Sequence, residues 1–260
     1  MTLSSLAAPG AVVSVVSHGH GLLVQALLAD LARWSAASVR RVVLTQNLPE
    51  PEPVPPPGGW PFVLTLIKNP RPCGFGANHN RALAGATEPV VCVINPDVAL
   101  VPGRDPFAAL VQAALQPGVG CAYPEQLDAQ GVPQDCEREL PTPTALWRRH
   151  ARCAAETRVD WVNAACIALP VAVWQQLGGF DETYFMYCED VDLCLRLRLQ
   201  GWALQRAPVQ VVHAGQRASH QHWRHLRWHV RSLFHLWRSP VYAQARRLLL
   251  RSDAGTIGAS

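Results

Sequence analysis

The chain has 260 residues, of which 49% are hydrophobic and 16% charged, a composition typical of a globular protein and not of a disordered one. No apolar run approaches the roughly 20 residues of a membrane-spanning helix, and no basic stretch precedes the first apolar run as in an export signal. The eight cysteines include no CxxC pair, which excludes zinc ribbons and thioredoxin-like motifs. We therefore expect a cytoplasmic protein with mostly buried, reduced thiols.

The net charge of +4 conceals a division between two parts of the chain. Residues 1–192 carry 12 basic and 18 acidic side chains, whereas residues 193–260 carry 11 arginines and a single acid, Asp253. We expect a mildly acidic main domain over residues 1–215 and a basic helical extension over residues 216–260.

Short apolar runs alternate with helical segments along most of the chain, which is the pattern of an α/β domain. The proline-rich residues 49–59 cannot continue a helix or a central strand. Residues 124–158 are weakly patterned, with a short helix expected near 146–154. We predict strands over 11–17, 41–45, 62–67, 89–94, 118–123 and 161–169, and helices over 22–34, 78–86, 106–115 and 172–177.

Polar segments follow the first four predicted strands, at the edge where open α/β sheets bind ligands. The fourth is Asn95-Pro96-Asp97. An aspartate after proline is common in turns, but one carboxylate with a hard divalent cation can also bridge phosphate oxygens. In NPRPCGFGANHN, which follows the third strand, Gly74 and Gly76 allow close backbone approach. A dinucleotide-binding fingerprint would follow the first strand and needs a third glycine, so the motif argues against a dinucleotide oxidoreductase.

The segment GGFDETYFMYCEDVDLCLRLRLQGW places Glu189, Asp190 and Asp192 beside an apolar run. Carboxylates are costly near a core unless a cation, hydrogen bonds or a proton-transfer task compensates. The simpler explanation is an acidic helix N-terminus that complements the helix dipole.

From His220 the composition changes to that of a basic amphipathic helix. Trp223, Leu226, Val230 and further apolar residues recur at helical spacing, while arginines take the other faces. Such a helix either packs on the main domain with its arginines solvated or lies on an anionic membrane, and both interpretations stay open. We expect no nucleic-acid partner, because no nucleic-acid-binding module is recognisable.

In their order, these segments resemble family 2 glycosyltransferases of the GT-A fold, particularly the bacterial rhamnosyltransferase-like members. The resemblance covers roughly residues 10–235 and is carried by GFGANHN, INPD, WVNAACIAL, the acidic segment above and the isolated His213 after PVQVV. It implies an α/β fold with a mostly parallel central sheet flanked by helices, followed by the basic amphipathic extension.

The resemblance also implies roles for individual residues. Asp190 would be the general base and Glu189 would orient the acceptor, whereas Asp192 is expected to be structural. Asp97 and His213 would hold a divalent metal, Mg²⁺ or Mn²⁺. The donor would be a dTDP- or UDP-linked sugar, contacted by Ser17, His18, Gln46, Asn47, Gly74, Phe75, Asn80, Asn95 and Asp97.

The function implied is inverting transfer of rhamnose or a similar hexose from the nucleotide sugar to a hydroxyl of a saccharide or lipid-linked acceptor, in bacterial surface-polysaccharide biosynthesis. Residues 220–240 would contact the inner face of the cell membrane peripherally, and the oligomeric state stays open, with a homodimer among the options. One departure matters: Gln46 stands where many relatives carry an acid that contacts the nucleobase. It leaves the base undecided and supports an alternative, a non-catalytic sugar-nucleotide-binding or scaffold protein with a degenerate GT-A fold.

Overall fold

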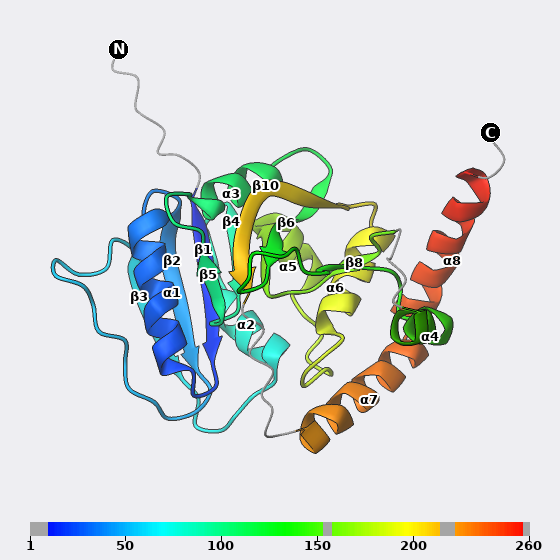
Figure 1. Cartoon of the computed structure of the whole chain (residues 1–260), viewed down its shortest axis with the longest axis horizontal. Coiled ribbons are helices and arrows are strands. Elements are labelled where there is room, and N and C mark those ends of the chain that lie inside the picture. Colours follow the sequence, from blue (N-terminus) through cyan, green and yellow to red (C-terminus); the bar gives the residue numbers. More distant parts are fainter. Residues whose placement is uncertain (1–9, 153–157, 214–221, 257–260) are drawn as a thin grey trace, which may run out of the picture.

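The computed structural model describes residues 10–152, 158–213 and 222–256. Their strands and helices alternate through most of the main domain, as the sequence predicts (Figure 1). The strands are β1 (Ala11–Ser17), β2 (Val39–Gln46), β3 (Val63–Lys68), β4 (Val90–Ile94), β5 (Val98–Leu100), β6 (Val119–Leu127), β7 (Glu137–Arg138), β8 (Trp161–Val162), β9 (Cys166–Pro170) and β10 (Ala203–His213). The helices are α1 (Gly21–Trp34), α2 (Phe75–Leu83), α3 (Pro106–Ala114), α4 (Pro143–Arg152), α5 (Val171–Leu177), α6 (Glu189–Leu199), α7 (His222–Arg238) and α8 (Pro240–Thr256).

Eight strands form one central sheet in the order β3-β2-β1-β4-β9-β6-β10-β5. The pairs β3-β2, β2-β1, β1-β4 and β6-β10 are parallel, while β9 and β5 run antiparallel to their neighbours. The prediction of a mostly parallel α/β sheet flanked by helices is therefore confirmed. The two remaining short strands, β7 and β8, pair with each other.

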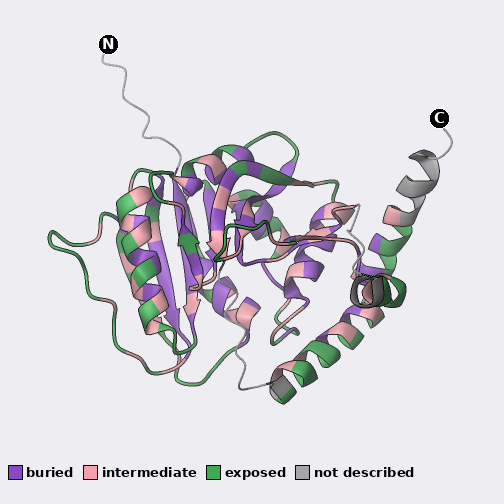
Figure 2. Ribbon diagram, in the orientation of Figure 1, coloured by how far each residue is buried: buried purple, intermediate pink, exposed green. Residues whose placement is uncertain are grey.

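Two apolar clusters cover the two faces of this sheet, which explains why β1 and β4 are almost continuously apolar (Figure 2). Side chains of α1 and α3, such as Leu28 and Phe107, pack on one face. Side chains of α2, α5 and α6, such as Leu83, Trp174 and Leu193, pack on the other. Strands buried on both faces lose the alternation of polar and apolar residues and read as apolar runs.

The predicted strand over residues 161–169 is wrong as a single element. The structure has two strands there, β8 and β9, separated by Asn163, Ala164 and Ala165. Asn163 leaves the strand because its side-chain amide pairs with that of Gln126, at 2.7 and 3.2 Å. Partners this distant in sequence leave no trace in local periodicity.

Strand β6 is longer than predicted and runs through Pro124. Proline lacks an N–H donor and is tolerated in sheets only where no ladder bond is needed. Pro124 lies at the irregularity in the β6-β10 pairing, between the pairs Tyr123–Arg206 and Glu125–Gln210. Pro124, at which the predicted strand stops, therefore lies where the hydrogen bonding between β6 and β10 is interrupted.

Two predicted helices begin earlier than expected. Helix α2 starts at Phe75 and not at residue 78, and its first N–H donates to the carbonyl of Phe185 at 2.9 Å. Helix α4 starts at Pro143 and not near residue 146, and the predicted end at Ala154 lies outside the described residues.

Helices α7 and α8 pack against α6 and the segment before α4 through a third apolar cluster. This third cluster contains Leu140, Tyr184, Cys188, Val191, Leu195, Leu236, Tyr242 and Ala245.

The predicted boundary between residues 215 and 216 lies outside the described residues. Within residues 10–152, 158–213 and 222–256, no helix combines the length and the apolarity needed to cross a membrane.

A buried ion pair fixes the start of α6, and it agrees with the structural interpretation of Asp192. Arg196 Nε donates to Asp192 Oδ2 at 2.6 Å, and the same guanidinium donates to the carbonyls of Leu177 and Gly179. The Asp192 side chain is only 2% exposed. Arg196 thereby ties the helix to the turn at the start of the acidic segment.

Replacing Arg196 with methionine should lower the free energy of unfolding by about 3 kcal/mol, because the Asp192 carboxylate would stay buried without its partner. Urea denaturation measures the change. Arg206→Met serves as the matched control, since its ion pair with Glu137 is half-exposed and should contribute at most about 1 kcal/mol. Equal losses in both variants would contradict a special role for the Asp192–Arg196 pair.

Candidate active site

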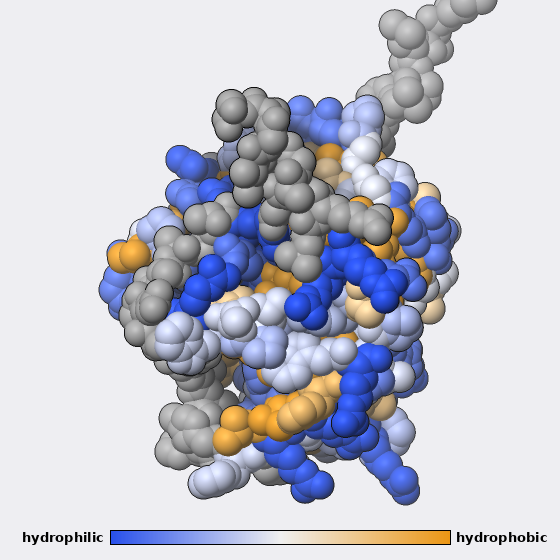
Figure 3. All heavy atoms as spheres, turned by 90° about the vertical axis from the view of Figure 1, so that its right-hand side faces the viewer, coloured by the Kyte–Doolittle hydropathy of each residue, from blue (hydrophilic) through white to orange (hydrophobic). Residues whose placement is uncertain are grey.

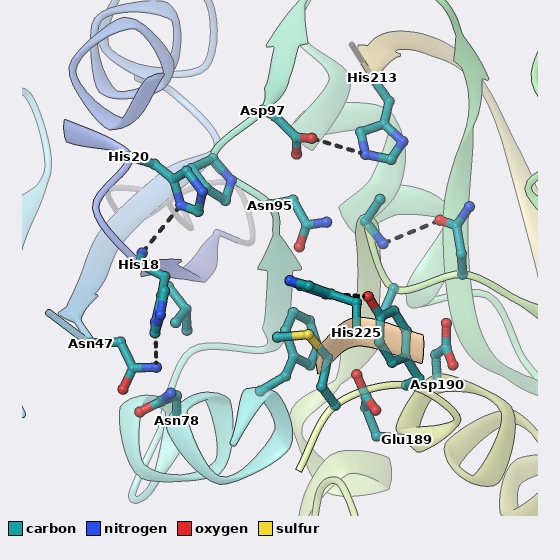
Figure 4. Close-up of a pocket in the computed structure, with 18 of the residues that line it drawn as sticks. His18, His20, Asn47, Asn78, Asn95, Asp97, Glu189, Asp190, His213 and His225 are labelled. Atoms are coloured by element: carbon teal, nitrogen blue, oxygen red, sulfur yellow. Dashed lines mark hydrogen bonds and ion pairs between the residues drawn. The ribbon is translucent and has the colours of Figure 1, made fainter. Parts of the chain in front are cut away.

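A cavity of about 750 Å³ lies at the carboxyl ends of β1, β2 and β4. Open α/β sheets bind their ligands at this edge. Figure 4 shows three groups of side chains around it: His18, Asn47 and Asn78; Asp97 and His213; and Glu189 and Asp190. Segments that are far apart in sequence thus meet in one hollow.

A network of amide groups around Asn47 builds the first side of the cavity. Its Oδ1 accepts from Cys73 N at 2.8 Å and from Asn69 Nδ2 at 2.9 Å, while its Nδ2 donates to Cys73 O at 3.0 Å. The same Nδ2 lies 3.2 Å from His18 Nδ1. Asn78 Oδ1 completes the network by accepting from Asn69 Nδ2 at 2.6 Å. This wall is therefore held rigidly and presents polar groups to a ligand.

Of the residues predicted to contact a donor, five line the cavity: His18, Asn47, Phe75, Asn95 and Asp97. Four others do not. Ser17 Oγ accepts from His20 N at 3.1 Å, and Gln46 Nε2 donates to the carbonyls of Glu50 and Pro51. The glutamine that replaces the expected acid at position 46 therefore holds the adjacent loop and does not face the cavity.

Gly74 and Asn80, the other two, contact other segments of the chain and not the cavity. A side chain at Gly74 would come within 2.8 Å of the Phe185 carbonyl, so the close approach that requires glycine is to the chain and not to a ligand. Asn80 accepts from Phe180 N and donates to Phe180 O, both at 2.8 Å. These two residues join the start of α2 to the segment that leads into α6.

Asp97 and His213 meet because β10 pairs antiparallel with β5, which sets His213 opposite Val98. His213 Nε2 lies 3.4 Å from Asp97 Oδ2 (Figure 4). His213 Nδ1 is buried and has no hydrogen-bond partner among the described residues. The pair thus directs one carboxylate and one imidazole at the same corner of the cavity.

These two groups fit a divalent metal. Two adjacent ligands of a six-coordinate ion, each about 2.1 Å away, lie roughly 3 Å apart, close to the observed separation. No group of three or more metal-binding side chains occurs in the described part of the chain. Any ion here would therefore complete its shell with ligand oxygens and water, as Mg²⁺ commonly does with phosphates.

Glu189 and Asp190 begin α6 on another side of the cavity. Burial, and secondarily the neighbouring Asp190, raise the pKa of Glu189 to about 8; its Oε2 is buried with no hydrogen-bond partner among the described residues. Burial also raises the pKa of Asp190 to about 6, opposed by hydrogen bonds from the backbone of Val191 and Ala164. Burial therefore opposes ionisation of both carboxyls, and more strongly at Glu189 than at Asp190, a difference suited to acid–base chemistry.

The backbone that delivers these two acids is strained. Tyr187 and Cys188, which directly precede Glu189, both adopt left-handed conformations, with φ of 71° and 67°. Non-glycine residues rarely do so, and such strain gathers at functional sites held by their surroundings. Here the Tyr187 hydroxyl is hydrogen-bonded to His225 Nδ1 at 2.7 Å, and Cys188 is buried in the third cluster.

The lining residues that were not among the predicted site residues include Asn78, Asn163, Tyr187, His225 and His229. Asn78 lies in the motif GFGANHN and could have been chosen over Asn80 from its place in α2, because positions 78 and 80 face different sides of a helix. The histidines carry no sequence signal, since only tertiary packing brings α7 to the cavity.

Comparisons with known proteins agree with this fold. The profile described as "Glycosyltransferase like family 2" matches residues 59–234, and the chain belongs to this family. The chain is 28% identical to the N-acetylglucosaminyl-diphospho-decaprenol L-rhamnosyltransferase of Mycobacterium tuberculosis over 232 residues, which are 77% of this chain and 75% of the relative. It is 39% identical over 84 residues to the rhamnosyltransferase WbbL of Escherichia coli, 31% of each chain.

Solved structures give the same fold. The mannosyltransferase PcManGT from Pyrobaculum calidifontis, in complex with GDP-Man and Mn²⁺, superposes with a TM-score of 0.59 at 17% identity, covering 95% of this chain and 75% of that one. Residues 1–349 of TarS from S. aureus, in complex with UDP, superpose with a TM-score of 0.52 at 14% identity, covering 80% and 58%. The resemblance to family 2 and to the GT-A fold is thereby confirmed.

Proposed function

We propose that the protein is a metal-dependent, inverting glycosyltransferase that moves rhamnose or a similar hexose from a dTDP- or UDP-linked donor to a hydroxyl of a saccharide or lipid-linked acceptor. The observation that carries the proposal is the meeting, in one cavity, of Asp97 with His213 and of Glu189 with Asp190. The rhamnosyltransferases among the relatives support the sugar and a role in bacterial surface-polysaccharide synthesis.

The chemistry follows from the two carboxyls. The ionised Asp190 accepts the proton of the acceptor hydroxyl as its oxygen attacks the anomeric carbon, and the neutral Glu189 donates a hydrogen bond that orients the acceptor. The new C–O bond forms as the bond to the diphosphate oxygen breaks. A single displacement inverts the anomeric centre, and no second nucleophile is required. A divalent ion held by Asp97 and His213 would neutralise the charge of the departing nucleoside diphosphate.

The binding-protein alternative depends on Gln46, whose side chain does not line the cavity. A thermal-shift screen of dTDP- and UDP-sugars with Mn²⁺ or Mg²⁺ identifies the donor, because a ligand of the native state raises the apparent Tm. NMR of the transfer product then tests the mechanism. An inverted anomeric configuration supports the proposal, whereas retention would contradict single displacement.

The raised pKa values predict a bell-shaped dependence of kcat/KM on pH. Below about pH 6, Asp190 takes up a proton and can no longer act as a base, so the rate falls. Above about pH 8, Glu189 ionises, which removes its O–H donor and adds a charge beside Asp190. In Glu189→Gln, whose amide stays neutral, the decrease above pH 8 should disappear while the decrease below pH 6 remains. An unchanged alkaline limb would contradict the role of Glu189.

We propose further that residues 220–240 contact the inner face of the membrane. Arg227 and Arg231 are exposed on α7, and each basic residue near an anionic surface contributes about 1 kcal/mol. Removing residues 216–260 would uncover the third apolar cluster, so point variants are the better test. Replacing both arginines with glutamine should weaken binding to anionic vesicles about 30-fold in co-sedimentation. The same change at the exposed Arg33 and Arg104 is the control, and equal binding by both double variants would contradict membrane contact.

A further inference from the structure

Helix α7 forms a wall of the cavity that the chemistry above leaves without a role. His225, Leu226 and His229 line the cavity, and the rings of both histidines contact Tyr187, two residues before Glu189. Figure 4 shows the His225 ring reaching from the side of Glu189 toward the middle of the cavity. The wall therefore adjoins the acids assigned to the acceptor.

The outward face of the same helix carries an exposed apolar stripe. Its members, Trp223, Leu226, Val230 and Phe234, are 85%, 54%, 44% and 52% exposed and are spaced three or four residues apart, so they share one face. In Figure 3 a band of hydrophobic side chains, bordered by hydrophilic ones, crosses the lower part of the molecule where α7 lies. An exposed apolar patch with a polar border marks an interaction site.

The stripe and the cavity are continuous at Leu226, which belongs to both. A ligand that fills them together needs a polar group beside His225 and His229 and a hydrocarbon chain along the stripe. Imidazole N–H groups donate to phosphate oxygens, and the exposed Arg227 and Arg231 add positive charge next to the stripe. A free saccharide has no hydrocarbon chain for the stripe, and a protein partner would have no reason to enter the cavity at its catalytic end.

We propose that α7 is the binding site for the phosphate group and the adjoining hydrocarbon chain of a lipid-linked acceptor. His225 and His229 bind the phosphate, Leu226 and the stripe bind the chain, and the sugar at the head of the lipid reaches Glu189 and Asp190. This assignment rests on the proposed function and deepens it, because it selects the lipid-linked acceptor over the free saccharide and names the residues that hold it.

The test is isothermal titration of the full chain with farnesyl diphosphate, inorganic diphosphate or farnesol, in EDTA. Farnesyl diphosphate should bind at least about tenfold more tightly than either fragment, because only this probe fills both parts of the site. His229→Ala should weaken its binding about tenfold or more, as loss of a hydrogen bond to a charged group does. Leu226→Gln should weaken the binding of farnesyl diphosphate but not the binding of inorganic diphosphate. Both side chains are exposed, so neither variant uncovers core.

His235→Gln is the matched control on the same helix, since His235 contacts Thr183 and Tyr184 and does not line the cavity. Equal binding by His229→Ala and His235→Gln would overturn the proposal. Loss of probe binding in Asp97→Asn would also overturn it, because it would place the probe in the donor site. A dimer of the unaltered protein that becomes a monomer in Leu226→Gln, measured by sedimentation, would overturn it too, because the stripe would then be a contact between two copies of the chain. Failure of the proposed function is seen separately, as absence of donor turnover by the unaltered protein.

Discussion

Asp190→Asn should lower the rate of sugar transfer by about 10²–10⁴-fold while leaving donor affinity nearly unchanged. The loss is that of a general base, because an amide cannot take the proton from the attacking hydroxyl. Donor affinity should persist because Asp97, His213 and the amide network around Asn47 lie on other sides of the cavity. Product formation at saturating donor measures the rate, and titration with the donor measures affinity.

Glu182→Gln is the matched control for this variant. Glu182 belongs to the same acidic segment, is exposed and accepts from Asn80 Nδ2 at 3.0 Å, which a glutamine oxygen can also do. Its rate should stay within about twofold of the unaltered protein, as expected for an exposed residue outside the cavity. Near-normal turnover in Asp190→Asn would contradict the assignment of the base.

Asp97→Asn should lower kcat/KM by about 10²-fold or more, because charge stabilisation by a metal ion contributes several kcal/mol to such reactions. The amide removes the negative charge that would hold the ion beside His213. The same variant should lose the increase in Tm that Mn²⁺ and nucleoside diphosphate together give the unaltered protein.

Asp135→Asn provides the comparison for the metal prediction, since Asp135 is exposed and forms a surface ion pair with Arg138. Chelation of divalent ions should reduce the unaltered protein to the rate of Asp97→Asn and change that variant little further. Full activity of the unaltered protein in EDTA would contradict a metal at Asp97 and His213.

The sequence predicts the sheet well where burial alone shapes it. Strands β1 and β4 appear as nearly continuous apolar runs because both faces are covered by helices. The sequence-based prediction fails where a residue distant in sequence determines the local structure. The pairing of Asn163 with Gln126 interrupts a predicted strand, and Pro124 lies at an irregularity between β6 and β10. Periodicity reports local burial and carries no information on such partners.

The candidate site divides in the same way. The acids and Asn95 stand at element ends in recognisable motifs, and the resemblance assigned His213, which β10 brings beside Asp97. Gly74 and Asn80 belong to a motif too, but the structure uses them to join α2 to the acidic segment. The histidines of α7 could not be predicted, because their position depends on how the C-terminal helices pack in the third cluster.

We expect this cavity to catalyse the cleavage of a nucleotide sugar and not merely to bind it. The most direct measurement is release of nucleoside diphosphate from a panel of dTDP- and UDP-sugars by the purified chain with Mn²⁺, beside Asp97→Asn. The unaltered protein should release nucleoside diphosphate from at least one donor, and the variant should show background release. Binding of a nucleotide sugar without release from any donor, with and without added saccharide or lipid-linked acceptors, would contradict it and favour the binding protein.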